Sequence, residues 1–277
     1  MGAIPRAFCF ALLTGLAPAS HAASRPSSTR EVRESTASGV AIPPPLNQLH
    51  VGERLSFRGR WFGIPVGRGW IEVKGIEEWA GRRVYRIEAE GRTTGVFGAL
   101  YPVRDSIVSH VDAETLEPLR FEKHQREGRY RADEVVLFDH QRHVANYRSL
   151  LNGSEKEIPI PPDVHDIVSG FYWLRMRAAD PNHPIRMAIY SDERVYETEI
   201  KPIRAATLEL LRSTFPCLVI EPLAQFKGIL VRRGRMWVYV SADPYRIPLF
   251  VRVTTPWGPL TGIIDRASLR AMRRRSS

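Results

Sequence analysis

The sequence predicts a mainly β protein: a curved antiparallel sheet, shaped as a half-barrel or open barrel, with one principal amphipathic helix. Three observations predict it. Apolar and polar residues alternate with a period of two along most of the chain, turn-forming pairs separate these segments at hairpin intervals, and one segment has helical periodicity. The 277 residues are 43% hydrophobic and 25% charged, an ordinary globular composition that excludes a collagen-like or wholly disordered chain.

Residues 1–23 have the features of a secretory signal. Arg6 supplies a positive n-region, and the apolar run at 7–13 is too short to span a bilayer about 30 Å thick. Ser20-His21-Ala22 offers the small residues that a signal peptidase reads, so we expect cleavage after Ala22 or Ala23. No later stretch approaches ~20 consecutive apolar residues. We therefore expect a periplasmic or otherwise exported protein without a transmembrane segment, soluble after cleavage.

The ends of the remaining chain differ in composition from its middle. Residues 24–48 are rich in Ser, Thr and Pro and poor in large apolar side chains, which predicts a disordered leader. Residues 266–277 contain five arginines and form a basic tail, which we expect to make one or two helical turns or none. Between them, residues 50–265 are expected to form a single antiparallel β domain.

Alternation within this domain assigns side chains to two faces. One face of each predicted strand is apolar and the other is charged or polar, which favours antiparallel pairing with one wet face. The apolar positions include Leu55, Phe57, Trp61, Ile71, Val73, Tyr85, Ile87, Ala89, Met236, Val238, Leu249, Val251 and Val253.

One segment, residues 163–177, has apolar residues at intervals of three and four, from Val164 to Leu174. Asp163 is positioned to cap its first turn, and Asp166 lies within that turn, where a carboxylate is favoured by the helix dipole. Arg175 and Arg177 fall in the last turn, where cations are favoured. The sequence therefore predicts one amphipathic helix packed on the apolar face of the sheet.

Signatures of catalysis are absent from the sequence. It contains no G-x-S-x-G elbow, no phosphate-binding glycine loop and no H-E-x-x-H motif. His140 and His143 come nearest to a metal cluster, but a metal site needs three or four ligands. We expect no metal and no cofactor, and a non-enzymatic role more than an enzymatic one.

The charge and the aromatic residues suggest the kind of partner. Forty Lys and Arg against 30 Asp and Glu give a formal charge of +10, which favours anionic partners. An exported protein meets little nucleic acid and no such motif is present, so phospholipid headgroups or lipopolysaccharide phosphates are the expected anions. The arginine tail either contacts them or stays solvated. The six tryptophans either line a concave sheet that holds an acyl chain or form ordinary core.

Four stretches, taken in their order and spacing, resemble a family of exported bacterial proteins known as domain of unknown function DUF3108. They are Gly52–Phe57 with Trp61–Gly67, Tyr101–Ile107 with Val111-Asp112, Asp166–Ser169 with Tyr172–Arg175, and Trp237–Asp243 with Arg246–Leu249. The resemblance spans about residues 50–265 and implies an exported antiparallel β domain without an established activity. A looser analogy links it to the half-barrels of periplasmic lipoprotein carriers, in which a curved sheet and a helix enclose an apolar groove. The chain departs from the family at 212–216, where a turn glycine is missing.

Polar and aromatic residues of the matched stretches are the candidate ligand-binding residues. The polar ones lie at predicted strand or helix ends, where Asp–Arg pairs either close the sheet or receive a ligand headgroup. The full set is Trp61, Tyr101, Arg104, Asp105, Asp166, Trp173, Arg175, Trp237, Asp243 and Arg246.

Three functions remain open from the sequence. The first is a non-catalytic envelope protein that binds a lipid, a lipoprotein acyl chain or another amphipathic ligand in a curved sheet. The second is a structural or assembly module that docks on an outer-membrane or cell-wall partner through its sheet edge and basic tail. The third is a hydrolase of an envelope polymer, which needs two carboxylates such as Asp105 and Asp243 within ~10 Å of each other.

Overall fold

The computed structural model describes residues 32–36, 44–45, 47–177, 183–226, 229–230, 235–255 and 258–275. Most of these belong to a single sheet of 17 strands, so the predicted mainly β class is confirmed. The predicted signal sequence at residues 1–23 lies outside the described residues.

The strands and helices have the following bounds. The strands are β1 Val32–Thr36, β2 Arg54–Trp61, β3 Ile64–Trp79, β4 Arg82–Thr93, β5 Arg104–Asp112, β6 Pro118–Glu127, β7 Tyr130–Asp139, β8 Val144–Ser149, β9 Glu155–Pro159, β10 Val164–His165, β11 Ile185–Ser191, β12 Arg194–Leu210, β13 Ser213–Phe226, β14 Ile229–Leu230, β15 Arg235–Ser241, β16 Pro248–Thr255 and β17 Gly258–Ile264. The helices are α2 Gly95–Leu100, α3 Ile167–Arg175 and α4 Arg266–Arg275.

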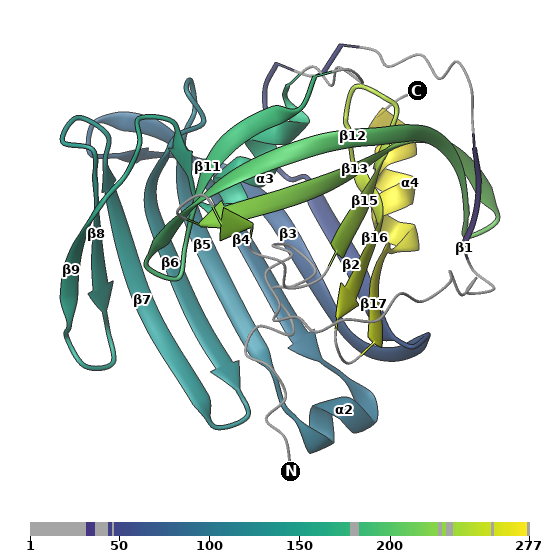
Figure 1. Ribbon diagram of the computed structural model, residues 1–277, viewed down its shortest axis with the longest axis horizontal. Helices are drawn as coiled ribbons and strands as arrows, with labels where there is room; N and C mark the ends of the chain where they lie inside the picture. Colours follow the sequence, from purple (N-terminus) through teal and green to yellow (C-terminus); the bar gives the residue numbers. More distant parts are fainter. Residues whose placement is uncertain are drawn as a thin grey trace.

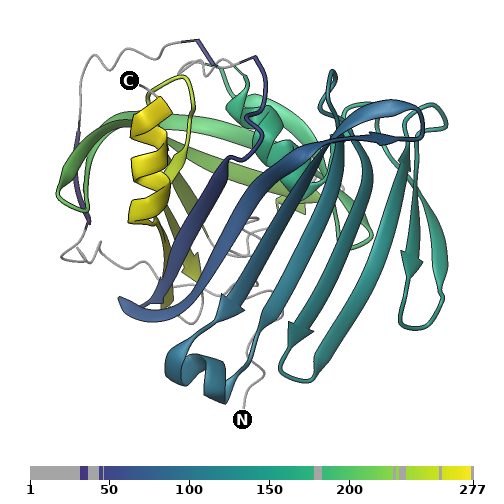
Figure 2. The same cartoon turned by 180° about the vertical axis from the view of Figure 1, so that it is seen from behind.

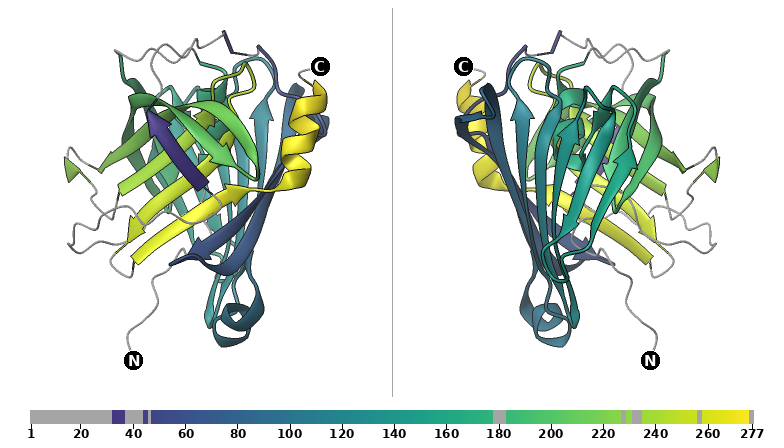
Figure 3. Two further views of the ribbon diagram at one scale, coloured as in Figure 1. Left: turned by 90° about the vertical axis from the view of Figure 1, so that its right-hand side faces the viewer. Right: turned by 90° about the vertical axis from the view of Figure 1, so that its left-hand side faces the viewer.

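The sheet consists of two halves that are joined at one seam. Strands β2 to β9 form an antiparallel meander, and β11 to β17 form the other half (Figure 1). The seam is the antiparallel pair β17–β2, in which Leu260–Ile264 lies opposite Trp61–Phe57. Seen from the side, the halves face each other at an angle and enclose a concave space (Figure 3). Among the described strands, only the β10–β11 pair is parallel.

The period-two pattern sorts side chains onto the two faces as the sequence predicted. Leu55, Ile71, Ile87 and Ile107 stand on the concave face of β2, β3, β4 and β5, and each is 2% exposed or less. These residues belong to one apolar core that includes both halves of the sheet and α3. Burying such faces against each other is the main stabilising term of the fold.

The meander and the β11–β12 hairpin contact each other through side chains, and no backbone pairing joins them in the described part of the chain. The turn between β11 and β12 reaches the concave face of the meander, where the Asp192 carboxylate lies 2.6 Å from Lys123 Nζ. Next to it, the Phe138 and Tyr190 rings make an edge-on contact with centroids 5.5 Å apart. The sheet is therefore curved but not closed into a barrel.

The prediction of one principal helix is corrected by the structure, which contains three short helices in its described part. The segment at 163–177 is helical only from Ile167, because Val164–His165 pairs with β11. Asp166, and not Asp163, is the N-cap, and it forms a capping box with Ser169. This helix lies between the two halves of the sheet at one end (Figure 1).

Parts of the expected leader and of the expected basic tail form secondary structure in the described residues. Residues 32–36 of the expected leader form β1 on the edge of β12, because β12 extends beyond β11 and leaves backbone groups there to be paired. In the expected basic tail, 266–275 form α4, which packs against the edge of β2 (Figure 2). Ser268 Oγ accepts a hydrogen bond from the Ser56 amide, and Leu269 joins the core.

Glycines permit close approach of β3 and β4 beside the seam. A Cβ atom at Gly67 would lie 2.6 Å from the Arg92 carbonyl oxygen, which is closer than real contacts allow. A Cβ at Gly75, on the same strand, would have no neighbour within 4 Å. The close approach of the two strands therefore depends on Gly67 and not on Gly75.

We predict that Gly67→Ala lowers the free energy of unfolding by about 1–3 kcal/mol, because the strands must move apart to admit the methyl group. The matched control Gly75→Ala should change it by less than about 1 kcal/mol. Urea denaturation of the two variants measures the difference, and equal stabilities would contradict the assigned backbone contact.

Candidate functional site

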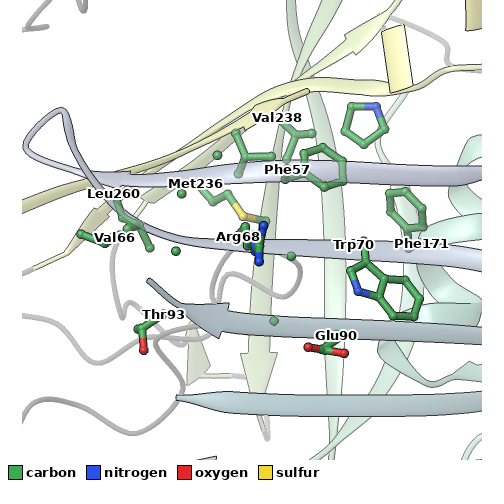
Figure 4. Close-up of a pocket in the computed structure, with 17 residues that line it drawn as sticks. Phe57, Val66, Arg68, Trp70, Glu90, Thr93, Phe171, Met236, Val238 and Leu260 are labelled. Carbon is green, nitrogen blue, oxygen red and sulfur yellow. The ribbon is translucent and has the colours of Figure 1, made fainter. Parts of the chain in front are cut away.

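The concave face holds a narrow apolar groove beside the seam. Figure 4 shows Met236 and Val238 of β15 facing β2 and β3, with Val66 and Leu260 at one end of the groove and Phe171 of α3 at the other. These side chains present carbon and sulfur, so the lining is almost entirely apolar. A groove of this kind offers a site for an apolar chain and few polar groups to orient it.

The floor of the groove consists of glycines from four adjacent strands. Gly262 of β17 lies opposite Gly59 of β2, which lies opposite Gly67 of β3; further along β3, Gly69 lies opposite Gly91 of β4. Because none of them has a side chain, the sheet surface is lowered to its backbone here, whereas branched side chains cover it elsewhere. The groove exists because these positions converge.

The groove has little free volume. Its free volume is about 80 Å³, or about 920 Å³ when all the empty space out to its open side is included. A space this narrow fits a single polymethylene chain better than a ring system. The flexible thioether of Met236 on its wall allows the width to adapt.

Of the predicted site residues, Trp61 lies nearest to this groove. Its ring packs with Val66 and Leu260 in an apolar cluster that also contains Phe97 of α2, with ring centroids 5.8 Å apart. Trp173 and Trp237 are half-buried against the core, each with an arginine over its ring. The aromatic residues therefore do not converge on one site.

Arg175 is buried and has a structural role. Its guanidinium donates two hydrogen bonds to the Glu53 carboxylate, at 2.6 and 2.9 Å, and two to the Tyr245 carbonyl oxygen. The bidentate pair joins the C-terminal end of α3 to the residue that precedes β2. The sequence named Arg175 as a candidate ligand-binding residue and did not identify Glu53 as its partner.

Asp166 holds the other end of α3. Its Oδ1 accepts hydrogen bonds from the backbone N–H groups of Val168 and Ser169, and its Oδ2 accepts one from Ser109 Oγ of β5 at 2.6 Å. All of its carboxylate oxygens are thus used within the protein. Asp166 fixes the helix against the sheet and is not free to bind a ligand.

Asp243 and Arg246 organise the loop between β15 and β16. Asp243 Oδ1 accepts from Ser241 Oγ and from the backbone N–H groups of Tyr245 and Arg246. The Arg246 guanidinium donates to the Arg177 carbonyl oxygen at 2.7 Å, next to the end of α3. Both residues therefore support the end of the sheet near α3, through backbone groups and not through an Asp–Arg side-chain pair between them.

Asp105, Tyr101 and Arg104 lie at the opposite end of the meander, near α2. Asp105 is fully buried on the concave face, accepts a hydrogen bond from the Arg126 amide, and shares one with the Glu127 carboxyl group. Burial, followed by the nearby Glu127, raises its pKa to about 7. Burial and the same two carboxyl groups raise the pKa of Tyr101. Arg104 is 74% exposed on the convex face.

The two carboxylates proposed for hydrolysis are separated in the fold. Asp105 belongs to the α2 end of β5, whereas the hydrogen bonds of Asp243 all lie in its own loop beside α3. No described interaction joins them. Within the described ranges, no cluster of three or more His, Cys, Asp or Glu residues is placed to hold a metal ion, and no helix is long and apolar enough to cross a membrane.

Sequence reasoning missed the glycine floor and a polar cluster on the concave face. The Lys123 ammonium group lies between Glu134 and Asp192 at 2.7 and 2.6 Å. Burial lowers the pKa of Lys123, but these two carboxylates outweigh burial and hold the pKa above its usual value. The available signal was polar residues at inward positions of β6, at 123, 125 and 127, where the alternation predicts apolar ones.

Comparison with known proteins provides a family and a fold. The profile of a family described as "Protein of unknown function (DUF3108)" matches residues 55–265. A crystal structure of a beta-barrel-like protein of domain of unknown function DUF1849 from Brucella abortus is similar at a TM-score of 0.55 and 9% identity, covering 79% of this chain and 97% of that one. A protein with a YmcC-like fold from Bacteroides fragilis gives a TM-score of 0.31 and 10% identity, over 82% and 98%. No curated protein matches the chain.

We predict that Glu53→Gln lowers the free energy of unfolding by about 3–5 kcal/mol, because the buried Arg175 cation loses its counter-charge. The control is Glu157→Gln, whose partner Arg142 is exposed, so that the loss should stay below about 1 kcal/mol. Urea denaturation compares the two. Similar small losses would show that Arg175 does not depend on Glu53.

Asp105 predicts a pH-dependent stability. The pKa of Asp105 is raised from 3.8 to about 7 in the folded protein. The stability that its protonated carboxyl group contributes is therefore fully present below about pH 4 and is lost as the pH rises through 7. Asn at this position keeps the acceptor for the Arg126 amide and donates to Glu127. Asp105→Asn should therefore be more stable than the wild type at pH 8, by on the order of 1–3 kcal/mol, and nearly equal at pH 4. Parallel stability curves from pH 4 to 8 would exclude the buried carboxyl pair.

Proposed function

The chain belongs to the DUF3108 family of proteins of unknown function, and we propose that it is a non-catalytic protein of the cell envelope that holds an apolar or amphipathic ligand, such as a lipid acyl chain, in the concave face of its sheet. The observation that carries the proposal is the glycine-floored groove with its apolar walls. The signal-like pattern of residues 1–23 supports export to the envelope.

The chemistry of the groove favours an acyl chain over a polar ligand. Its walls come from Met, Val, Leu and Phe side chains, and burying a methylene group against such a surface contributes about 0.8 kcal/mol. An eight-carbon stretch would thus contribute roughly 6 kcal/mol before the cost of immobilising the chain. The lining also includes Arg68, Glu90 and Thr93, so the polar end of an amphipathic ligand would have partners beside the apolar walls.

The assembly-module alternative loses part of its support. Its basic tail was expected to extend from the domain, yet the first turns of α4 are anchored on β2 through Ser268 and Leu269. An anchored helix of this kind does not act as a free arm, and its Arg266 and Arg270 are exposed on the surface of the domain. The hydrolase alternative is not supported, because Asp105 and Asp243 occupy different ends of the sheet.

We predict that Met236→Trp, which fills the groove from its wall, lowers the affinity for a fluorescent fatty acid by at least about tenfold. Met236 is half-buried, so the indole is added without opening the core. The control Leu137→Trp adds the same ring at a position 44% exposed on β7 and should leave the affinity unchanged.

Mass spectrometry of wild-type protein purified from the periplasm provides the second readout. Lipid should co-purify with the wild type and with Leu137→Trp, and should be reduced in Met236→Trp. A wild-type protein that carries no lipid and takes up no fatty acid would overturn the proposal. Equal uptake of the fatty acid by both variants would show that the ligand binds outside this groove.

A further inference from the structure

One end of the molecule exposes an apolar tip. It consists of the turn between β2 and β3 together with α2, which are joined by the Trp61–Phe97 ring contact. The exposed residues are Phe62 (61%), Ile64 (56%), Val96 (72%) and Leu100 (78%). None of the six residues of α2 is buried, although three of them are large and apolar. Exposed apolar clusters of this kind mark surfaces that bind a partner or a membrane.

The backbone conformation of Phe62 adds to the argument. Phe62 and Gly63 form the turn with φ angles of +49° and +81°, a conformation that strongly favours Asn-Gly or Gly-Gly. A phenylalanine with positive φ is strained, on the order of 1 kcal/mol, and here it also keeps a large ring in water. The ring packs against the Trp61 ring, with centroids 5.4 Å apart, and over Gly258, yet the residue remains 61% exposed.

A row of arginines crosses the convex face just above the tip. Arg58 of β2 lies opposite Arg68 of β3, Arg68 opposite Arg92 of β4, and Arg92 opposite Arg104 of β5. Like charges directly opposite each other destabilise a sheet. Arg58, Arg68 and Arg92 have no ion-pair partner within the described part of the chain, and Arg104 has only a loose one, with Nε 3.8 Å from Glu90. The row is therefore a site of uncompensated positive charge.

The spacing between this row and the tip suits a lipid surface. Two to four residues lie between each arginine and the tip, which corresponds to about 10–17 Å along a strand. Both intervening segments, 59–67 and 93–103, contain no Asp or Glu. A side chain that enters a bilayer interface reaches about 5–10 Å into it, and an arginine that lies further from the membrane centre is then at the depth of the phosphate groups.

We propose that the tip and the arginine row form a docking surface for an anionic phospholipid bilayer. Phe62, Ile64, Val96 and Leu100 enter the interface, and Arg58, Arg68, Arg92 and Arg104 bind the phosphate groups. The apolar groove begins at Leu260 and Val66, which pack with Trp61 directly behind this tip. The idea that an acyl chain reaches the groove through this docking surface rests on the proposed function. The membrane contact itself does not depend on it.

Flotation of the purified protein with vesicles tests this surface. Vesicles of phosphatidylethanolamine and phosphatidylglycerol should bind the wild type, whereas phosphatidylcholine vesicles should bind it at least about tenfold less. The double variant Val96→Ser/Leu100→Ser should lose most of the binding. Its control, Leu150→Ser/Leu151→Ser, removes two leucines that are 50% and 54% exposed in another turn and should retain it.

A second pair of variants tests the charges. Arg68→Gln/Arg92→Gln should weaken binding to the anionic vesicles by about tenfold or more and reduce its salt dependence. Arg142→Gln/Arg186→Gln removes two exposed arginines from other surfaces and should change little. Equal binding by the tip and row variants and their controls would overturn the proposal, as would binding that does not distinguish anionic from neutral vesicles.

The same proteins separate this inference from the groove. Met236→Trp should bind anionic vesicles normally while failing to take up the fluorescent fatty acid. Val96→Ser/Leu100→Ser should take up the fatty acid from solution normally while failing to bind vesicles. Loss of both activities in both variants would contradict two distinct sites.

Discussion

Five glycines meet on the concave face where β17, β2, β3 and β4 run side by side, and the rest of the structure is arranged around that meeting. At Gly67 a Cβ atom would lie 2.6 Å from the Arg92 carbonyl oxygen, so β3 and β4 approach this closely only because the residue is glycine. The two halves of the sheet face each other across these glycines, and the missing side chains leave the groove between them.

Polar interactions then hold the bent sheet in its shape. Asp166 and the Arg175–Glu53 pair fix the two ends of α3 between the halves, and Lys123 joins the β11–β12 turn to the meander. Each of these is a charge-assisted contact of a buried charged group, Asp166, Arg175 or Lys123, for which the loss of a partner is costly. These contacts set the distance between the two halves of the sheet. Apolar packing alone would fix that distance less specifically.

The sequence predicted those features that depend on local patterns. Alternation along β2 to β4 assigned the concave and convex faces correctly, and the 3–4 spacing located α3 to within a few residues. Of the candidate site residues, Arg175, Asp166, Asp243 and Arg246 serve as supports of the fold, and the periodicity of their segments could not distinguish that role from ligand binding. The features that the sequence did not predict depend on which residues of distant segments come to lie next to each other. Glu53 and Arg175 are 122 residues apart, and the glycines converge only once four strands are aligned.

Transfer of magnetisation from a bound fatty acid to glycine Hα atoms in an otherwise deuterated protein tests the central claim most directly. The account predicts intermolecular nuclear Overhauser effects between acyl protons and the floor glycines Gly59, Gly67, Gly69, Gly91 and Gly262, and none to Gly128 or Gly153 in distant turns. Effects confined to surface turns, or a bound chain that shows no contact with the floor glycines, would contradict it.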